Sequence, residues 1–409
     1  MSWLMRFERY AGRIAIGVAA AVFIFGIVYG VSLEDRLRFP DEREYLTLAD
    51  NLVDHGAYTR DGTQPTAYRP PGYPVALAAL RWLGADLTVL RLLNFALLSL
   101  TVVAVYALAR ELGGRTAGAI GALVVGAYPF YLYLAGTLYP QTLAMLLLVA
   151  GLLALARAPH VSGRRQSALA AAGGLAFGYL AVTVPTFIWS FVAVLVWLGI
   201  RHRAVAAKLV AIALPAALAL PVAWTVRNAI ELDALVPIAT NNGYQLLLGN
   251  NENATPGSGV DVDISSHRPA QNLDEVESNR HYQDEAIDWI TEHPGEAVAL
   301  YVGKAANYFA FRNDLATGSE SSSFRDFVAA VSYLPLLALF VVRLALFRRR
   351  PLTSLERLLS VLVIGNAIVL AVYTTRVRYR LPLDALMILV VAGFLAMLLT
   401  KARRTRSAA

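Results

Sequence analysis

The chain has 409 residues, of which 57% are hydrophobic and 16% are charged, whereas an average soluble domain has about 45–50% and about 25%. This composition excludes a soluble enzyme, a fibrous protein and a disordered chain. The absence of cysteine excludes a disulfide framework, a thiol nucleophile and a cysteine-ligated zinc. The formal net charge of +7 is informative only once the charges are placed along the chain.

The apolar residues occur in long blocks, and about 20 of them in a row suffice to cross a bilayer core of roughly 30 Å. We therefore predict an all-α polytopic membrane protein with about ten transmembrane helices. The expected spans are 12–32, 87–109, 116–135, 139–156, 167–183, 186–200, 205–226, 326–347, 355–374 and 381–400. Two shorter apolar stretches, 72–84 and 297–311, are expected to lie at the interface. The first span is expected to be an uncleaved anchor.

The basic residues cluster in the short segments between alternate spans. With a cytoplasmic N-terminus, the inner tails and loops hold 20 Lys and Arg against 3 acidic residues, and the rest of the chain holds 16 against 26. The inner segments are 1–13, 110–115, 157–165, 201–208, 343–357 and 401–406. The positive-inside rule explains this asymmetry. We therefore predict a bacterial inner-membrane protein with both termini in the cytoplasm, and no nucleic-acid partner.

Two long polar segments fall on the outer side. They divide the chain into a first transmembrane helix at 1–32, a first outer loop at 33–86, transmembrane helices at 87–226, a second outer loop at 227–325, three further transmembrane helices at 326–400 and a cytoplasmic tail at 401–409. Long loops in a compact protein are usually functional. We therefore expect the active site on the periplasmic or extracellular face.

The first outer loop begins an amphipathic helix at Pro40 and Asp41, and Gly56 ends it. A carboxylate at the start of this helix suits two roles. Asp41 either caps a surface helix or acts as a general base towards an acceptor hydroxyl. Further on, Arg69 precedes three prolines within five residues, a stiff turn that carries the arginine either into a site or out to the headgroups.

The second outer loop contains Asn-Gly and Gly-Asn pairs at Asn242–Gly243 and Gly249–Asn250. They are typical of turns, here expected to bound short extended stretches. An amphipathic helix is expected at about 274–292, ended by Pro294, with an apolar helix carrying Lys304 after it. Asp261 and Asp263 resemble a metal-binding Asp-x-Asp pair, but we interpret them as structural or solvated acids.

Arg376, Arg378 and Arg380 form a cluster between the last two spans, on the side that the positive-inside rule disfavours. A charge in the apolar zone costs roughly 2.5–3.5 kcal/mol on insertion scales. The cluster therefore needs an anionic partner, and guanidinium groups suit phosphate. Pairing with the acidic outer loops or with lipid headgroups is the alternative.

These motifs, in this order, resemble the bacterial protein-mannosyltransferase-like glycosyltransferases of family 39, in the GT-C class, which are related in architecture to the lipid A aminoarabinose transferase. The resemblance covers most of the chain. It rests on Asp41-Glu42 with Tyr45, Arg69-Pro70-Pro71-Gly72-Tyr73-Pro74, Trp224 to Asn228, Thr240-Asn241 to Asn251, Asp284 to Pro294 with Lys304, and Arg378-Tyr379-Arg380-Leu381-Pro382.

The resemblance implies a GT-C-like fold and transfer of a sugar from a polyprenyl-phosphate donor to a hydroxyl of an envelope acceptor, with inversion. It implies Asp41 as general base and Glu42 as its support or as a sugar ligand. The groups that it implies for the donor phosphate are Arg69, Arg227, Lys304, Arg378 and Arg380. Expected substrate contacts are Tyr45, Tyr68, Tyr73, Asn241, Asn250 and Tyr379. No metal site is predicted, although the resemblance leaves a divalent cation open.

Two positions depart from the family pattern. Relatives often have Ser-Glu where this chain has Pro140-Gln141, and Arg-Pro-Thr where it has Val184-Pro185-Thr186. Either the two lost charges formed a pair, or they touched substrate and the chain has changed specificity or lost activity.

Two other functions therefore stay open. A transporter of lipid-linked saccharide needs ionisable groups near the midplane, and the spans are almost free of acids. The other is a non-catalytic membrane protein that binds glycan or lipid.

Overall fold

The computed structural model describes residues 3–269, 273–313 and 322–408, and every regular element in that part of the chain is helical. The helices are α1 (Trp3–Ser32), α2 (Pro40–His55), α3 (Gly72–Arg81), α4 (Leu87–Ala127), α5 (Pro129–Ala135), α6 (Gln141–Arg157), α7 (Gly163–Thr183), α8 (Ile188–Arg201), α9 (Arg203–Glu231), α10 (Asn242–Gly249), α11 (Glu275–Glu292), α12 (Pro294–Asn307), α13 (Ser323–Ala345), α14 (Ser354–Leu370) and α15 (Val377–Ala408).

Seven helices in the described part of the chain are long and apolar enough to cross a membrane: α1, α4, α6, α7, α9, α13 and α15. The chain is therefore an all-helical, integral, multi-pass membrane protein. Every one of the ten predicted spans falls on a helix, but α8 and α14 have only 14 and 17 residues. The predicted number of ten crossings remains an expectation for these two shorter helices.

α4 contains two of the predicted spans and reverses between them. Gly113 and Gly114 leave helical geometry, with φ of −154° and +67°. A Cβ on Gly118 would touch the side chain of Tyr106, and one on Gly121 would touch Val105. In a straight helix these residues would be more than two turns apart, so the two halves lie antiparallel. The predicted spans at 87–109 and 116–135 are thus a hairpin, and Pro129 begins the separate short helix α5.

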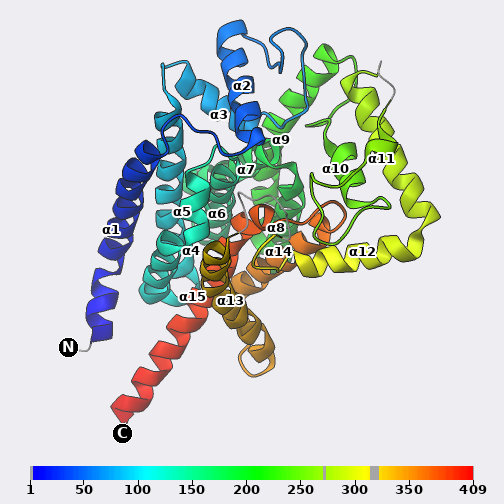
Figure 1. The fold of residues 1–409 in the computed structure, drawn as a ribbon. Helices are drawn as coiled ribbons and strands as arrows, with labels where there is room; N and C mark the ends of the chain where they lie inside the picture. Colours follow the sequence, from blue (N-terminus) through cyan, green and yellow to red (C-terminus); the bar gives the residue numbers. More distant parts are fainter. Residues whose placement is uncertain (1–2, 270–272, 314–321, 409) are drawn as a thin grey trace.

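The two segments predicted to be outer fold as helices: α2 and α3 lie at the top of the view, and α10, α11 and α12 lie to the right of the bundle (Figure 1). α2 begins at Pro40, and Gly56 closes it in the left-handed conformation with φ of +67°, as predicted. The predicted helix at 274–292 is α11, and Pro294 begins α12. The prediction of short extended stretches around the Asn-Gly and Gly-Asn pairs is wrong. Residues 242–249 form α10, because Leu247 and Leu248 bury an apolar face against α11.

The bundle has one end where the termini lie and an opposite end where α2 and α3 lie (Figure 1). Three of the predicted inner loops meet at the first end. Arg157 pairs with Glu111 at 2.9 Å, and the rings of His160 and His202 are 5.4 Å apart. α15 runs through the core and packs against α4, α6, α13 and α14. Its first turn therefore brings Arg378 to the end of the bundle that carries α2.

Candidate active site

One carboxylate joins three segments that are far apart in the sequence. Asp41 Oδ1 accepts a hydrogen bond from Arg69 Nη2 at 2.9 Å, and Oδ2 accepts one from Arg378 Nη1 at 2.8 Å. Asp41 and Arg378 are 337 positions apart. All three side chains are largely buried, with 16–25% of their surface exposed. The structure therefore brings together the acid of the first outer loop and the arginine cluster before the last helix.

Local sequence holds Asp41 in place. Phe39 is the extended residue before α2, and Pro40 fits the first helical position because it has no N–H to satisfy. Glu42 is 1% exposed. Its Oε1 accepts from the backbone N–H groups of Arg38 and Phe39, and its Oε2 accepts from Leu138 N. Glu42 thus fastens the start of α2 to the turn before α6 and supports Asp41 through the backbone.

Arg69 is tied to the same helix a turn further on. Its Nε donates to Glu44 Oε2 at 2.7 Å, and its guanidinium lies 5.5 Å from the ring centre of Tyr45. Pro70 and Pro71 stiffen the chain that follows it. Arg69 is therefore aimed into the protein and does not extend to the headgroups.

Burial alone would raise the pKa of Asp41, but Arg378 and Arg69 outweigh it and hold that pKa below its ordinary value of 3.8. These ion pairs therefore stabilise the folded protein above pH 3.8, and that stabilisation is lost as the pH falls through the lowered pKa of Asp41. Asp41 is consequently a carboxylate at neutral pH, able to accept a proton but a weak base while both arginines hold it.

Arg378 is the residue at which two cavities meet. Its guanidinium lies over the ring of Tyr139, 4.7 Å from the centroid, and its Nη2 donates to the Tyr379 hydroxyl at 3.2 Å. Its Nε is buried and has no hydrogen-bond partner among the described residues. Because Arg378 and Tyr139 line both cavities, a group bound to Arg378 can be reached from either side.

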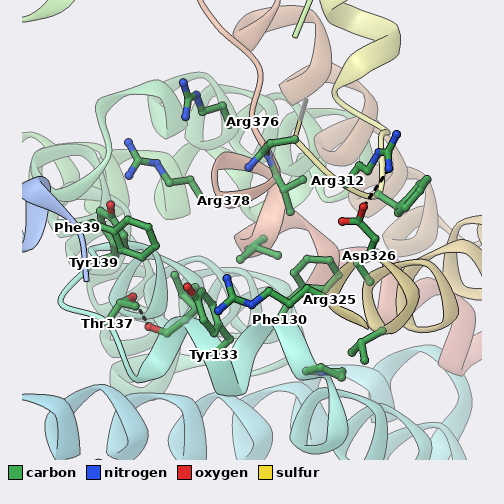
Figure 2. A pocket seen from close by; sticks show the side chains of 18 of the residues that line it. Phe39, Phe130, Tyr133, Thr137, Tyr139, Arg312, Arg325, Asp326, Arg376 and Arg378 are labelled. Carbon is green, nitrogen blue, oxygen red and sulfur yellow. Dashed lines mark hydrogen bonds and ion pairs between the residues drawn. The ribbon is translucent and has the colours of Figure 1, made fainter. Parts of the chain in front are cut away.

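The first cavity, of about 360 Å³, we call the arginine cavity (Figure 2). It lies between α5 and the start of α13, and most of its wall is aromatic or aliphatic. Figure 2 shows Arg376 and Arg378 together on one side of it, Arg325 beside Phe130, and Arg312 paired with Asp326. Four guanidinium groups and one carboxylate in an otherwise apolar wall suit an amphiphilic anion.

The second cavity, of about 380 Å³, we call the amide cavity. Its lining includes residues of α2, α6, α7, α8, α10 and α14, the chain before α8 and the first turn of α15. The charged residues of the lining are Arg69 and Arg378, and both already contact Asp41. The rest is uncharged, with carboxamides, hydroxyls and aromatic rings. This cavity differs from the arginine cavity in chemistry but shares its wall.

Three of the cations predicted to bind phosphate lie outside both linings. Arg380 is fully buried; its Nε donates to Asp384 at 2.9 Å, and its Nη1 donates to the carbonyls of Tyr308 and Ala310. It stacks on Tyr333 at 3.7 Å. A charge this deep needs a partner, and Asp384, four residues on, supplies it. The sequence prediction for Arg380 overlooked this acid.

Lys304 and Arg227 hold protein groups in the same way. Lys304 Nζ donates to the carbonyls of Gly249 and Tyr373 and to Asn250 Oδ1, and burial lowers the pKa of Lys304 to about 8. Asn250 is therefore also structural. Arg227 donates to the carbonyls of Thr66 and Tyr58. These residues join the predicted outer segments to the bundle.

Of the predicted substrate contacts, Tyr45, Asn241 and Tyr379 line the amide cavity. Tyr73 is buried and hydrogen-bonds Asn94, while Tyr68 stacks with Arg60 and Arg69 outside both linings. Sequence reasoning missed Arg312, Arg325 and Asp326 of the arginine cavity. The signal was present, because both arginines flank the predicted eighth span on its outer side, which the positive-inside rule disfavours.

Among the described residues, no group of three or more His, Asp or Glu side chains is placed to hold a metal ion. Asp261, one of the paired acids of the second outer loop, instead contacts Arg376 at 3.3 Å, as expected for a structural acid. Both oxygens of Asp41 are engaged by arginines. Among the described residues, the groups around Asp41 therefore do not fit a divalent cation.

No protein-family model matches the sequence, and no curated protein matches it. Among solved structures, it is similar to the archaeal oligosaccharyltransferase AglB from Archaeoglobus fulgidus in complex with an inhibitory peptide and a dolichol-phosphate. Identity is 14%, the TM-score is 0.56, and the match covers 100% of this chain and 52% of that one. The chain thus spans about half the length of the archaeal protein.

Two structures of ArnT from Cupriavidus metallidurans also match. The one bound to undecaprenyl phosphate has 14% identity and a TM-score of 0.49, over 94% of this chain and 77% of that one. The apo form has 15% identity and a TM-score of 0.41, over 94% and 76%. At these identities a likeness speaks to fold alone, and the AglB match has a TM-score above 0.5. The chain therefore has a fold like that of AglB.

Proposed function

We propose that the chain transfers a sugar from a polyprenyl-phosphate donor to a hydroxyl group of an envelope acceptor at the outer face of the inner membrane. The observation that carries the proposal is Asp41, held between Arg69 and Arg378 where the two cavities share a wall. One carboxylate for the acceptor and guanidinium groups for the leaving phosphate are the two requirements of such a transfer. The fold shared with AglB, whose structure holds a dolichol-phosphate, is in keeping with a lipid-phosphate donor.

The arginine cavity suits the donor. Its apolar wall includes the exposed start of α13, where Phe324 is 75% exposed and its neighbour Phe327 is 64% exposed. In a bilayer these side chains face lipid, which gives a prenyl chain a route to the cavity. Arg376 and Arg378 then meet the phosphate, and the unpartnered Nε of Arg378 is available as a further donor.

In the proposed reaction the acceptor hydroxyl approaches the anomeric carbon from the amide cavity. Its oxygen forms a bond to that carbon while the carbon–oxygen bond to the phosphate breaks, and the electron pair leaves with the polyprenyl phosphate. The hydroxyl proton goes to Asp41. Attack opposite the leaving group inverts the anomeric centre. Arg378 stabilises the negative charge that builds on the phosphate.

Donor binding would also strengthen Asp41 as a base. In the ligand-free protein Arg378 lowers the pKa of Asp41. A phosphate that binds Arg378 shares this guanidinium and adds negative charge nearby, and both effects raise the pKa of a carboxylate. Asp41 therefore becomes a better proton acceptor when the donor is in place.

The test measures binding and transfer separately. In nanodiscs, Arg378→Ala should weaken binding of farnesyl phosphate at least about tenfold, because the charge-assisted hydrogen bonds from the guanidinium to the phosphate are lost. Arg378→Lys should restore this binding only in part. Arg268→Ala, which removes an exposed outer arginine, is the control. Undiminished binding by Arg378→Ala would contradict the proposal.

Transfer is measured with polyprenyl-phosphate sugars as donors and an envelope lipid extract as the source of acceptors. Tight binding without transfer would indicate a non-catalytic binding protein. Movement of the lipid-linked sugar across liposomes without transfer would indicate a transporter.

A further inference from the structure

Gln141 is a buried polar side chain whose amide oxygen lacks a hydrogen-bond partner among the described residues. It opens α6 and lines the amide cavity, yet it is only 6% exposed. Its Oε1 is buried without a hydrogen-bond partner among the residues that the structure describes. A buried amide oxygen in this state is costly to a folded protein, and native structures retain few of them. Its presence at a cavity wall indicates that a ligand supplies the missing donor.

The other buried amides show that this state is an exception. The described chain has seven buried Asn and Gln side chains. The side-chain oxygens of the other six all accept a hydrogen bond: Asn94 from Tyr73, Gln166 from Lys208, Asn228 from Arg227, Asn250 from Lys304, Asn251 from Asn253 N, and Asn366 from Trp189. Among the seven, Gln141 therefore differs in that its side-chain oxygen accepts no hydrogen bond, and it lines a cavity.

The chemistry of the cavity indicates what that ligand is. Among the residues in its lining there is no acidic side chain, and its two arginines are already paired with Asp41. Asn241, Asn242 and Gln245 add three more carboxamides. A carboxamide offers both donors and an acceptor, and so does a sugar hydroxyl. A phosphate has acceptors alone and an ammonium has donors alone, so neither matches such a lining.

The position of Gln141 places this lining next to the reacting groups. Tyr139, two residues before it, stacks on Arg378 and lines both cavities. Val184, on the loop that leads to α8, lines the same cavity and adds an apolar surface. The two positions at which the sequence departs from the family pattern therefore lie in one cavity, and both are uncharged there.

We propose that Gln141 determines substrate specificity: its carboxamide accepts a hydrogen bond from a hydroxyl of a neutral sugar bound in the amide cavity. This inference rests on the proposed function and names the class of carbohydrate that it uses. The sugar belongs either to the donor or to the acceptor. In both cases an uncharged, hydroxyl-rich sugar is preferred over a uronic acid or an amino sugar.

The test compares Gln141→Met, of similar shape but without an amide, with the wild type in nanodiscs. The probes are farnesyl phosphate alone and farnesyl phosphate that carries a neutral hexose, a uronic acid or an amino sugar. If the donor sugar occupies the amide cavity, the variant binds the hexose-bearing lipid about tenfold more weakly, because one hydrogen bond to the sugar is lost. It then binds farnesyl phosphate with unchanged affinity. If the acceptor sugar occupies the cavity, the variant instead loses affinity for a neutral methyl glycoside, measured with farnesyl phosphate present.

Three controls keep the outcome interpretable. Gln141→Met should melt no lower than the wild type, because the amide oxygen that it removes has no partner in the folded chain. Gln64→Met, on the exposed outer loop, should change no affinity. Gln141→Glu should shift the preference towards the amino sugar, because it adds an acceptor with negative charge.

Unchanged binding of both neutral probes by Gln141→Met, or equal affinity of the wild type for charged and neutral sugars, would overturn the inference. These results are distinguishable from a failure of the proposed function. That failure would appear as farnesyl phosphate binding that does not depend on Arg378.

Discussion

The carboxylate of Asp41 has two guanidinium partners and 23% of its surface exposed. Such pairing is stronger than that of an exposed ion pair, because the low surrounding dielectric screens it less. It also keeps the carboxylate charged across the neutral range. Asp41 lies in the first turn of α2 but does not cap the helix, because Phe39 is the N-cap residue and Glu42 accepts the backbone N–H groups there. Its role as the general base stays our proposal.

Asp41→Asn removes the proton acceptor and keeps the side-chain shape. We expect sugar transfer to fall by at least about a hundredfold, the usual contribution of general base catalysis. Farnesyl phosphate should bind no more weakly, since Arg378 loses its competing carboxylate. Transfer from polyprenyl-phosphate sugars and lipid-phosphate binding are the two measurements.

The control for this variant lies on the same helix. Asp54→Asn changes an exposed acid near the end of α2 and should leave both measurements unchanged. If Asp41→Asn transfers sugar at the wild-type rate, Asp41 is not the base. If it weakens phosphate binding instead, Asp41 acts by positioning Arg378.

At the scale of elements, the start of α2 and the first turn of α15 make the site. α2 has its expected start and end, because Pro40 and Gly56 act locally and the run between them has helical periodicity. α10 shows the opposite case. Its Asn-Gly pair favours a turn, but the packing of Leu247 and Leu248 against α11 overrides that local preference.

The hairpin inside α4 depends on Gly114. Its φ of +67° and ψ of −162° lie in a region that is essentially restricted to glycine. Gly114→Ala should therefore lower the free energy of unfolding by about 1–3 kcal/mol, although a Cβ there meets no atom within 4 Å. The melting temperature in detergent is the measurement.

Gly199→Ala is the matched control for the hairpin variant. Gly199 lies inside α8, and a Cβ added there would also meet no atom within 4 Å. Alanine should be neutral there or stabilise the helix by about 0.5–1 kcal/mol. Equal melting temperatures for the two variants would show that the turn at Gly114 tolerates a side chain.

The whole molecule has two chemically different ends. Three of the predicted inner loops, which are rich in arginine, meet through the Arg157–Glu111 pair and the rings of His160 and His202. α2, whose first turn carries Asp41, lies at the end of the molecule opposite the termini (Figure 1). Charge asymmetry along the sequence predicts which end faces the cytoplasm.

Because the chain has no cysteine, single introduced cysteines report this orientation directly. Asp61→Cys, in the first outer loop, should react with a membrane-impermeant maleimide in intact spheroplasts. Ser162→Cys, in the loop before α7, should react only after lysis. Both positions are exposed, so the opposite pattern would mean that the site faces the cytoplasm.

The sequence by itself determined the class of protein, the approximate helices and the two long polar segments between them. These follow from local quantities, namely the length of apolar runs, prolines and glycines at helix ends, and the balance of charge across each loop. It also singled out Asp41, Arg69 and Arg378, because a carboxylate at a helix start and arginines on the disfavoured side are unusual in the chain itself.

Only the tertiary structure decided which charges are used within the protein and which face a cavity. Arg380 and Lys304 looked equivalent to Arg378 in sequence, but Arg380 pairs with Asp384 and Lys304 donates to buried carbonyls. The sequence left open whether the departure at Gln141 removed an ion pair or changed a substrate contact, whereas the structure places its amide oxygen, without a partner among the described residues, at a cavity wall. Whether a polar group is satisfied depends on neighbours far away in the chain, and local sequence carries no information about their distance.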